Sequence, residues 1–277
     1  MKNMQQATHS RPGSAGSRTT GHVHLIGAGP GDPELLTLRA LRLIQSADVV
    51  VHDRLVSDEI LACIPAHTRR IAVGKAAGFH PVPQDRINAI LVELGQAGLT
   101  VARLKGGDPT IFGRGGEEYE ALNAAGIPCD YVPGITAAQG AAASLRLPLT
   151  HRGLATGLRF VTGHRARDAA LDLDWASLAD PQTTLAVYMG AANMEEIARR
   201  LIAHGMPSDL PVLAVSQAST PRERRLRGDL RGIAGAFRDN PMPAPVLFLI
   251  GHVAALAEDA ALPIPTMPPT EKLVSHG

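Results

Sequence analysis

The hydrophobic and polar positions of this chain fall into blocks that predict strands and helices in alternation. Residues 22–26 form a short strand pattern, and Asp32 followed by Pro33 is a typical helix start. The apolar residues of the predicted helix share one face: Leu36, Ala40, Leu43 and Ala47. Residues 48–51 have the apolar pattern of a buried strand, so 22–51 is predicted to be a strand–helix–strand unit.

The same alternation continues to residue 134. It predicts a helix near 83–96, a strand at 100–104, a helix at 117–125 and a strand at 129–132. Strands that alternate with helices are typical of a mostly parallel sheet with helices on both faces. We therefore expect a first α/β domain that spans residues 21–134.

Residues 135–262 are expected to form a second α/β domain. It begins with a helix of small residues at 137–143 and has a further helix at 194–204. Its predicted strands are 158–162, 185–189, 212–216 and 246–250. The larger share of strand favours a mixed, partly antiparallel sheet. No segment repeats at a fixed period, which excludes solenoids and propellers.

The two ends of the chain differ from the rest in composition. Residues 1–20 are rich in Ser, Gly, Thr and Gln and carry no acidic residue. This composition predicts a disordered tail rather than a signal peptide, with a transit sequence as the alternative. Residues 263–277 are expected to form a flexible tail. No apolar run reaches the roughly 18 residues of a membrane span, so we expect a cytoplasmic protein with no membrane partner.

Composition and charge limit the partners further. Hydrophobic residues make up 45% of the 277 positions, enough for packed cores. A formal net charge of +1 argues against a generally basic nucleic-acid binder, and an aromatic content of 3% leaves few rings for base stacking. The arginine-rich run 222–231 is interrupted by Glu223 and Asp229, which favours a solvated hairpin.

Cysteine and histidine spacing predicts no metal site. Cys63 and Cys129 lie far apart and match no zinc or redox pattern, so we expect two ordinary buried thiols. Histidines such as His204 and His252 also lack ligand spacing.

Two glycine-rich loops follow predicted strands. The first, 27–32, reads Gly-Ala-Gly-Pro-Gly-Asp, with Asp32 where a dinucleotide fingerprint requires glycine. Asp48 and Asp53 lie about where a ribose-binding acid would stand, so a nucleotide-dependent oxidoreductase stays open beside a purely structural turn.

The second loop, 106–116, is more specific. Gly106 and Gly107 allow the backbone to approach a ligand, Asp108 puts a carboxylate beside it, and Arg114 stands among further glycines. No Gly-Lys-Ser/Thr closes the loop, so it is not a P-loop. A carboxylate suits a cationic or hydroxyl-rich ligand better than a phosphate.

The chain resembles the uroporphyrinogen-III C-methyltransferases of the tetrapyrrole methylase group. The resemblance runs from residue 22 to about 256 and depends on the order of many short motifs. These are Val23–Pro33, Leu36–Leu38, Val50–Val56, Gly74-Lys75, Arg103–Glu118, Val132–Ala137, Pro148–Arg152, Val161–His164, Tyr188–Gly190 and Val215–Gln217. It implies the two-domain α/β fold of the class III methyltransferases and a homodimer that binds S-adenosyl-L-methionine between its domains.

The resemblance also implies roles for single residues. Cofactor contacts would fall on Pro30, Gly106, Gly107, Asp108, Ile111, Thr136, Ala137, Met189 and Ala218. Arg114 and Arg152 would bind substrate carboxylates, because a guanidinium group binds a carboxylate through two hydrogen bonds. Glu117 would be a nearby partner for a pyrrole N–H or for an arginine. The structural alternative for Glu117 is an acidic residue in a helix's first turn.

The catalytic candidates that the resemblance implies are Asp53 as proton acceptor, Lys75 as proton donor, and Arg114, which positions charge. The structural alternative for Asp53 is a carboxylate that caps a turn. No metal is implied.

The implied reaction transfers methyl groups to C-2 and C-7 of uroporphyrinogen III. The product is precorrin-2, formed through precorrin-1, for sirohaem, cobalamin or haem d1 synthesis, and S-adenosyl-L-homocysteine is released. We expect a stand-alone methylase without fused dehydrogenase and ferrochelatase steps. Another methylase of the group and a non-enzymatic ligand carrier are the alternatives.

Two positions depart from the family pattern. Thr110 replaces an aromatic residue that often follows Gly-Gly-Asp-Pro, and Ala218-Ser219 replace a frequent glycine. We expect these changes to alter affinity and not the chemistry.

Overall fold

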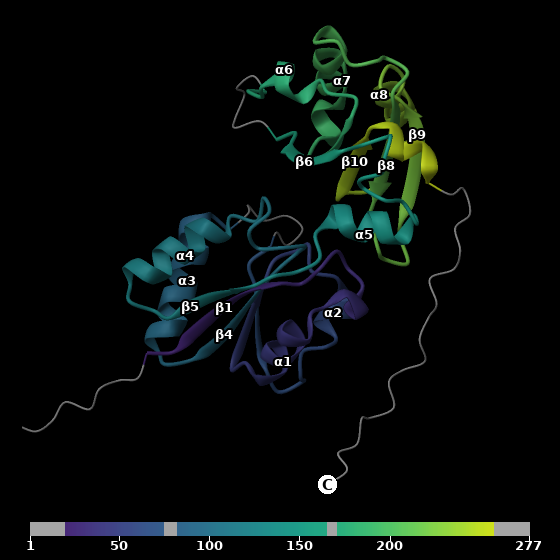
Figure 1. Ribbon diagram of the computed structural model, residues 1–277. Helices are drawn as coiled ribbons and strands as arrows, with labels where there is room; N and C mark the ends of the chain where they lie inside the picture. The colour runs from purple at the N-terminus through teal and green to yellow at the C-terminus, as the bar shows by residue number, and fades with distance from the viewer. Residues whose placement is uncertain (1–19, 75–81, 165–170, 258–277) are drawn as a thin grey trace, which may run out of the picture.

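A computed structural model of the chain describes residues 20–74, 82–164 and 171–257, which form two five-stranded sheets (Figure 1). The predicted tails, 1–20 and 263–277, lie outside the described residues except for Thr20. Lys75 also lies outside them.

The first sheet has the strand order β3-β2-β4-β1-β5, and every strand pair in it is parallel. Its strands are β1 (His22–Gly27), β2 (Val49–His52), β3 (Arg69–Ala72), β4 (Thr100–Lys105) and β5 (Cys129–Val132). Its helices are α1 (Leu38–Ser46), α2 (Asp58–Leu61), α3 (Gln84–Gln96) and α4 (Gly115–Ala124). The parallel α/β prediction is confirmed.

Two apolar clusters cover the two faces of this sheet. Ile44 of α1 and Ile60 of α2 pack with Leu104 of β4 on one face. Leu91 of α3 and Leu122 of α4 form the other cluster with neighbouring strand residues. The inner strand β2 is buried on both sides and accordingly begins with an unbroken apolar run, Val49–Val51.

The second sheet has the order β6-β7-β10-β8-β9 and is mixed, as predicted, because only β6 and β7 run parallel. Its strands are β6 (Gly157–Thr162), β7 (Thr183–Tyr188), β8 (Pro211–Ser216), β9 (Arg224–Asp229) and β10 (Val246–Ile250). Helices α6 (Trp175–Leu178), α7 (Met194–Ala203) and α8 (Ile233–Asp239) pack on one face, and α5 (Ala137–Ser144) packs on the other (Figure 1).

The helix predicted to start at Asp32 begins later. Asp32 caps only a short 3₁₀ helix, Pro33–Leu35, by accepting from the Glu34 N–H at 2.8 Å. Leu36 then returns to extended backbone, and Thr37 provides the N-cap of α1. Two successive capping side chains thus divide one predicted helix into two elements.

The arginine-rich run is the edge strand β9, antiparallel to β8. Strand β3 was not predicted, because it is short and mostly exposed and carries two adjacent arginines. The short helices α2, α6 and α8 were not predicted either, because they are only four to seven residues long. Helix α4 begins at Gly115 rather than at residue 117.

The prediction of two buried thiols is wrong in degree. Cys63 and Cys129 are free and half-buried, because Cys63 follows the short helix α2 and Cys129 begins an edge strand. Partial burial nonetheless raises the pKa of both thiols, that of Cys129 to about 12.

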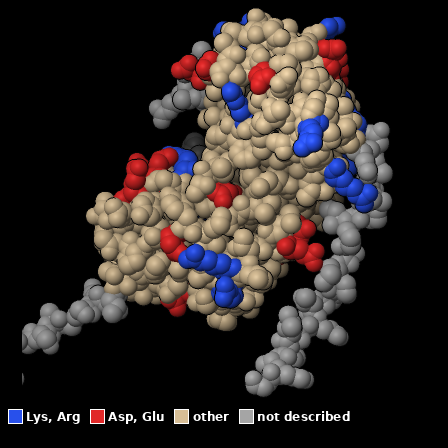
Figure 2. Space-filling view, viewed as in Figure 1, with Lys and Arg blue, Asp and Glu red and all other residues tan. Residues whose placement is uncertain are grey.

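Charged side chains of both signs are interspersed on the face shown in Figure 2. In the described part of the chain, no helix has the length and hydrophobicity to cross a bilayer.

A substitution at Phe248 tests how much the core of the second sheet contributes to stability. Phe248 is fully buried in the central strand β10, with its ring centroid 5.5 Å from that of Phe237. Phe248→Ala is expected to lower the free energy of unfolding by about 3–5 kcal/mol, because a cavity replaces the ring. Denaturant unfolding measures the loss. Leu38→Ala, at a residue 80% exposed, is the control and should cost far less; equal losses would contradict this assignment of the core.

Candidate functional site

Three loops meet at the carboxyl ends of the parallel strands, where open α/β sheets bind ligands. Gly29, after β1, and Gly107, after β4, form two backbone hydrogen bonds with each other, of 3.1 and 2.7 Å. The N–H of Gly134, after β5, donates to Asp108 Oδ2 at 2.9 Å. These bonds hold the predicted cofactor residues Gly107 and Asp108 at the crossing of the loops.

Close contacts and backbone conformation require glycine at this crossing. A Cβ on Gly134 would lie 2.3 Å from the Gly107 oxygen, and one on Gly27 would lie 2.5 Å from the Gly134 nitrogen. Gly107 also has a φ of +70°, which other residues rarely adopt. A Cβ on Gly106 would lie 2.7 Å from Leu55 Cβ, so the loop after β2 reaches the same place.

Asp108 is almost fully buried and both of its oxygens bond to protein. Oδ1 accepts from the backbone N–H of Thr110 at 2.7 Å and from its hydroxyl, while Oδ2 accepts from Gly134. Thr110, the departure from the family pattern, therefore helps to orient this carboxylate. The Ile111 N–H donates to the Asp108 carbonyl at 3.2 Å, which places Ile111 in the same turn.

The second sheet reaches this cluster through Tyr188. Its hydroxyl lies 2.6 Å from Thr136 Oγ1 and accepts from the Ala138 N–H at 3.2 Å. Burial raises the pKa of Tyr188, so the hydroxyl stays protonated, and either hydroxyl can donate the hydrogen bond between Tyr188 and Thr136. Predicted residues Thr136 and Ala137 thus lie beside Tyr188, and Met189 follows it with its side chain half-exposed.

Helix α5 brings Pro30 and the segment around Ala218 together. A Cβ on Gly140 would lie 2.5 Å from Pro30 Cγ and 2.6 Å from Ser219 Oγ. Ser219 Oγ and Gln217 Oε1, which flank Ala218, are buried without a hydrogen-bond partner among the described residues. Unpaired buried oxygens are costly, so a ligand donor would be favoured here.

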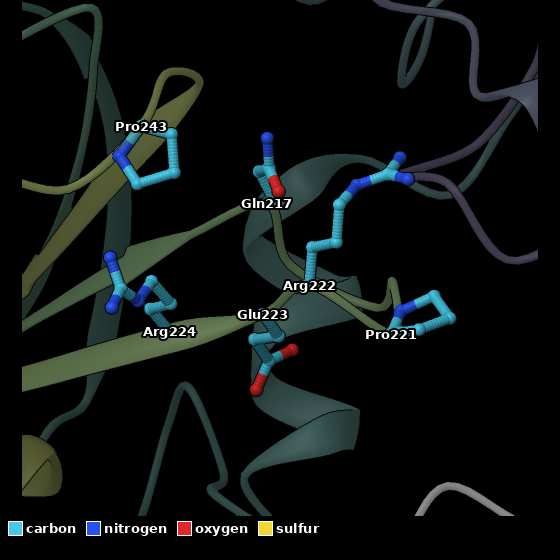
Figure 3. Close-up of a pocket in the computed structure, with 6 residues that line it drawn as sticks. All are labelled: Gln217, Pro221, Arg222, Glu223, Arg224 and Pro243. Atoms are coloured by element: carbon cyan, nitrogen blue, oxygen red, sulfur yellow. The ribbon is translucent and has the colours of Figure 1, made fainter.

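A hollow of about 510 Å³ opens next to this segment. Figure 3 shows that it is lined by Gln217, Pro221, Arg222, Glu223, Arg224 and Pro243, with the two guanidinium groups on opposite sides of Gln217.

Asp53 follows β2 and is partly exposed. Its Oδ1 accepts from the Leu55 N–H at 2.9 Å, so this carboxylate does cap a turn. Its Oδ2 lies 3.8 Å from Arg103 Nη1, at the edge of a buried charge cluster. One oxygen therefore has a structural role, and the other is the candidate for proton transfer.

The buried charge cluster consists of Arg103, Lys105 and Glu118. Glu118 Oε1 accepts from Arg103 Nη2 at 3.1 Å, from Lys105 Nζ at 2.8 Å and from Gln84 at 3.3 Å. Burial, and then the charge of Arg103, lower the pKa of Lys105, while Glu118 opposes the shift. Sequence reasoning missed the cluster, although two cations at alternate positions of an apolar strand were a visible signal.

Arg114 and Glu117 bond to each other at the start of α4. Two bonds of 2.7 Å join the guanidinium to the carboxylate, and both side chains are about half-exposed. The hydrogen bond raises the pKa of Arg114 and lowers that of Glu117. Arg152 lies on an exposed turn. In the described part of the chain, it takes no part in the contacts that join the loops after β1, β4 and β5.

The first loop lacks the geometry of a dinucleotide site. Only a three-residue 3₁₀ helix follows it directly, and α1 begins at Leu38. A pyrophosphate would therefore find no α-helix N-terminus immediately after the strand, which the dinucleotide fingerprint requires.

The parallel sheet with its loop crossing and the mixed second sheet together match a known class. Residues 22–234 match the Tetrapyrrole (Corrin/Porphyrin) Methylases, and the chain belongs to this family. It is 79% identical over 262 residues to a uroporphyrinogen-III C-methyltransferase of Paracoccus denitrificans, which covers 95% of this chain and 91% of that protein.

Two other relatives extend the comparison. A siroheme synthase of Acinetobacter baylyi is 52% identical over 86% of this chain, which spans about half of that longer protein. The crystal structure of a Thermus thermophilus uroporphyrin-III C-methyltransferase complexed with S-adenosylhomocysteine is 41% identical. It covers 85% of this chain and 100% of its own, with a TM-score of 0.74.

Glu118→Gln should unfold more easily than the wild type, because Arg103 and Lys105 lose their buried carboxylate and keep only the more distant, partly exposed Asp53. The expected loss in the free energy of unfolding is about 3–5 kcal/mol. Glu117→Gln, one residue away and exposed, is the matched control and should cost no more than about 1 kcal/mol. Denaturant titration of both variants is the measurement; a Glu118→Gln loss as small as that of the control would show that the cluster is not destabilised by losing its anion.

Proposed function

We propose that this chain is an S-adenosyl-L-methionine-dependent uroporphyrinogen-III C-methyltransferase. It methylates C-2 and C-7 of the macrocycle and gives precorrin-2 by way of precorrin-1. The similarity to the Paracoccus denitrificans enzyme carries this proposal, because it extends across both sheets and nearly the whole of each chain.

The loop crossing fits the cofactor. Gly106 packs closely against Leu55, and Gly107 lies in contact with Thr136 and Ala137, so the predicted contact residues converge here; buried unpaired oxygens flank Ala218. The cofactor would be held by the predicted set: Pro30, Gly106, Gly107, Asp108, Ile111, Thr136, Ala137, Met189 and Ala218. Because the oxygens of Asp108 already bond to protein, its main contribution is to fix the loops that hold the ligand.

When bound, S-adenosyl-L-methionine supplies an electrophilic methyl group to an electron-rich pyrrole carbon. The protein's task is then to align two reactants and to exclude water, and good orientation is worth about 7–11 kcal/mol. Tyr188 contributes by joining Thr136 and α5 to the second sheet, which fixes one side of the site.

A proton leaves the macrocycle after each transfer, and Asp53 is the proposed acceptor. Its Oδ2 lies 3.8 Å from the buried guanidinium of Arg103, so the carboxylate has a fixed position at the end of β2. Lys75 remains the proposed donor. Arg114, Glu117 and Arg152 are proposed to bind and orient the substrate carboxylates, with Arg114 exchanging its bond to Glu117 for a bond to substrate.

The proposal includes a cytoplasmic homodimer. Light scattering on the purified full-length chain measures its mass in solution, and a monomeric mass would reject the dimer.

The direct test mixes purified protein, uroporphyrinogen III and the methyl donor without oxygen, and follows product mass and absorbance. The expected product carries two added methyl groups. Binding of S-adenosylhomocysteine without methylation of this substrate would reject the substrate and keep the cofactor, which would favour another methylase of the family.

Asp53→Asn separates the two roles of this carboxylate. Asparagine retains an oxygen for the Leu55 N–H and so preserves the turn, but it cannot accept the proton. We expect kcat to fall by about 10²–10⁴-fold with unchanged S-adenosylhomocysteine affinity. Rapid-quench turnover and calorimetry measure these values, and wild-type kcat would leave only the turn-capping role.

Arg114→Gln and Arg152→Gln test the substrate side. Each removes a charge-assisted hydrogen bond worth about 1.5–3 kcal/mol, so kcat/KM should fall about tenfold to hundredfold. Cofactor affinity should not change. Arg199→Gln, which breaks an exposed pair with Glu196, is the control. Full turnover by both test variants would show that the substrate lies elsewhere.

A further inference from the structure

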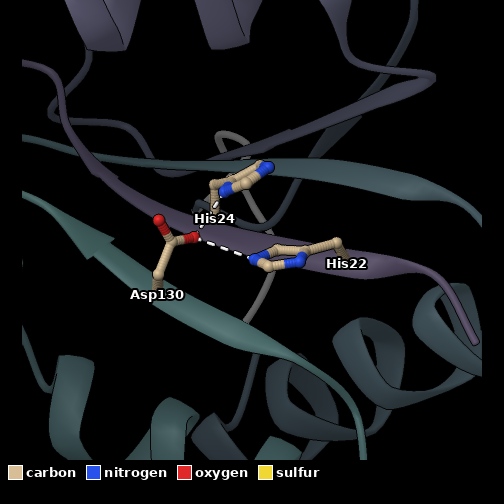
Figure 4. Close-up of side chains that lie close together, drawn as sticks. All are labelled: His22, His24 and Asp130. Carbon is tan, nitrogen blue, oxygen red and sulfur yellow. Dashed lines mark hydrogen bonds and ion pairs between the residues drawn. The ribbon is translucent and has the colours of Figure 1, made fainter.

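His22, His24 and Asp130 form a polar cluster in the first sheet that the proposed reaction does not use. His22 and His24 are two residues apart on β1, so their side chains share one face of the sheet. Asp130, on the neighbouring edge strand β5, is the direct register partner of His24. Figure 4 shows both imidazole rings beside the Asp130 carboxylate.

The donor atoms already lie close to the geometry of a metal site. His22 Nε2 is 3.0 Å from Asp130 Oδ1, and His24 Nδ1 contacts the same oxygen. The three ligand atoms all lie within 4.8 Å of one another. A tetrahedral ion with bonds of about 2.0–2.1 Å separates its ligands by about 3.4 Å, so only small side-chain movements are required.

The second oxygen of Asp130 has its own partner. Arg39, on α1, donates to Oδ2 and leaves Oδ1 directed at the histidines. Outer hydrogen bonds of this kind commonly orient a ligating carboxylate. The side chains of His22, His24 and Asp130 are 42%, 13% and 29% exposed, so an ion and a completing water molecule can reach the cluster.

We propose that His22, His24 and Asp130 bind one divalent transition-metal ion of the Zn²⁺ class. Two neutral imidazoles and one carboxylate are ligands that suit Zn²⁺ and Co²⁺, and they leave a position for water. The ion replaces the two N–H···O contacts that the histidines make with Asp130. No redox or group-transfer step is involved.

The place of the site in the sheet makes it structural. His22 pairs with Thr100 at the start of β4, whereas Gly27, at the loop crossing, pairs with Lys105 at its end. The metal therefore lies toward the amino ends of β1 and β5, whereas the candidate active site lies at the carboxyl ends of the strands. It cross-links β1 to the edge strand β5, so metal binding should stabilise the fold without changing methyl transfer.

Calorimetry with Zn²⁺ tests the proposal on tag-free, chelator-stripped, full-length protein. The wild type should bind one ion per chain, and Co²⁺ should give visible absorption bands typical of four or five coordination. His22→Ala and the double variant His22→Ala/His24→Ala should lose this binding and these bands. His204→Ala, at an exposed histidine bonded to the Arg200 carbonyl, is the matched control and should bind as the wild type does.

Thermal unfolding gives a second measurement. Zn²⁺ should raise the unfolding temperature of the wild type and of His204→Ala, and should not raise that of the His22 variants. Absence of saturable Zn²⁺ binding by the wild type would overturn the proposal and leave a hydrogen-bonded His–Asp–Arg cluster. Equal binding by the double variant would overturn it as well, because the ion would then lie elsewhere.

Discussion

The close backbone packing of Gly27, Gly107 and Gly134 is the constraint on which the rest of the site depends. These residues end or follow three parallel strands. A Cβ on Gly27 or Gly134 would clash with the backbone of the neighbouring loops, and Gly107 has a φ of +70° that other residues rarely adopt. Asp108 bonds to the third loop and to its own turn. Parallel strands bring their carboxyl ends together in any α/β sheet, but only this glycine packing lets the loops cross in contact.

The buried charges beneath the loops reinforce this arrangement. One oxygen of Glu118 binds Arg103 and Lys105, and Arg103 in turn approaches Asp53. A buried ion cluster contributes little net stability compared with apolar packing, but it tolerates few alternative arrangements. The cluster therefore specifies how the ends of β2 and β4 and the start of α4 lie relative to one another, which determines where Asp53 stands.

Much of the architecture was predictable because apolar periodicity reports burial directly. Strand β2 follows from that signal, and the mixed second sheet was predicted from the larger share of strand in the second half. Strand β3 was not predictable, since Arg69 and Arg70 carry no such pattern, and the split at Leu36 depended on two caps in competition. Motif resemblance selected most residues of the loop crossing, whereas Tyr188, Arg103 and the His22–His24–Asp130 cluster needed contacts between distant segments. The domain boundary at residue 134 stays a prediction.

Strand order in the first sheet also bears on how the chain folds during synthesis. Strand β1 leaves the ribosome first, yet both of its partners, β4 and β5, lie some 75 or more residues downstream. The apolar strand must therefore remain unpaired until most of the first sheet has been made. Such delayed, long-range pairing slows folding and leaves an aggregation-prone segment exposed. Early translation is thus the period when this protein most needs protection from aggregation.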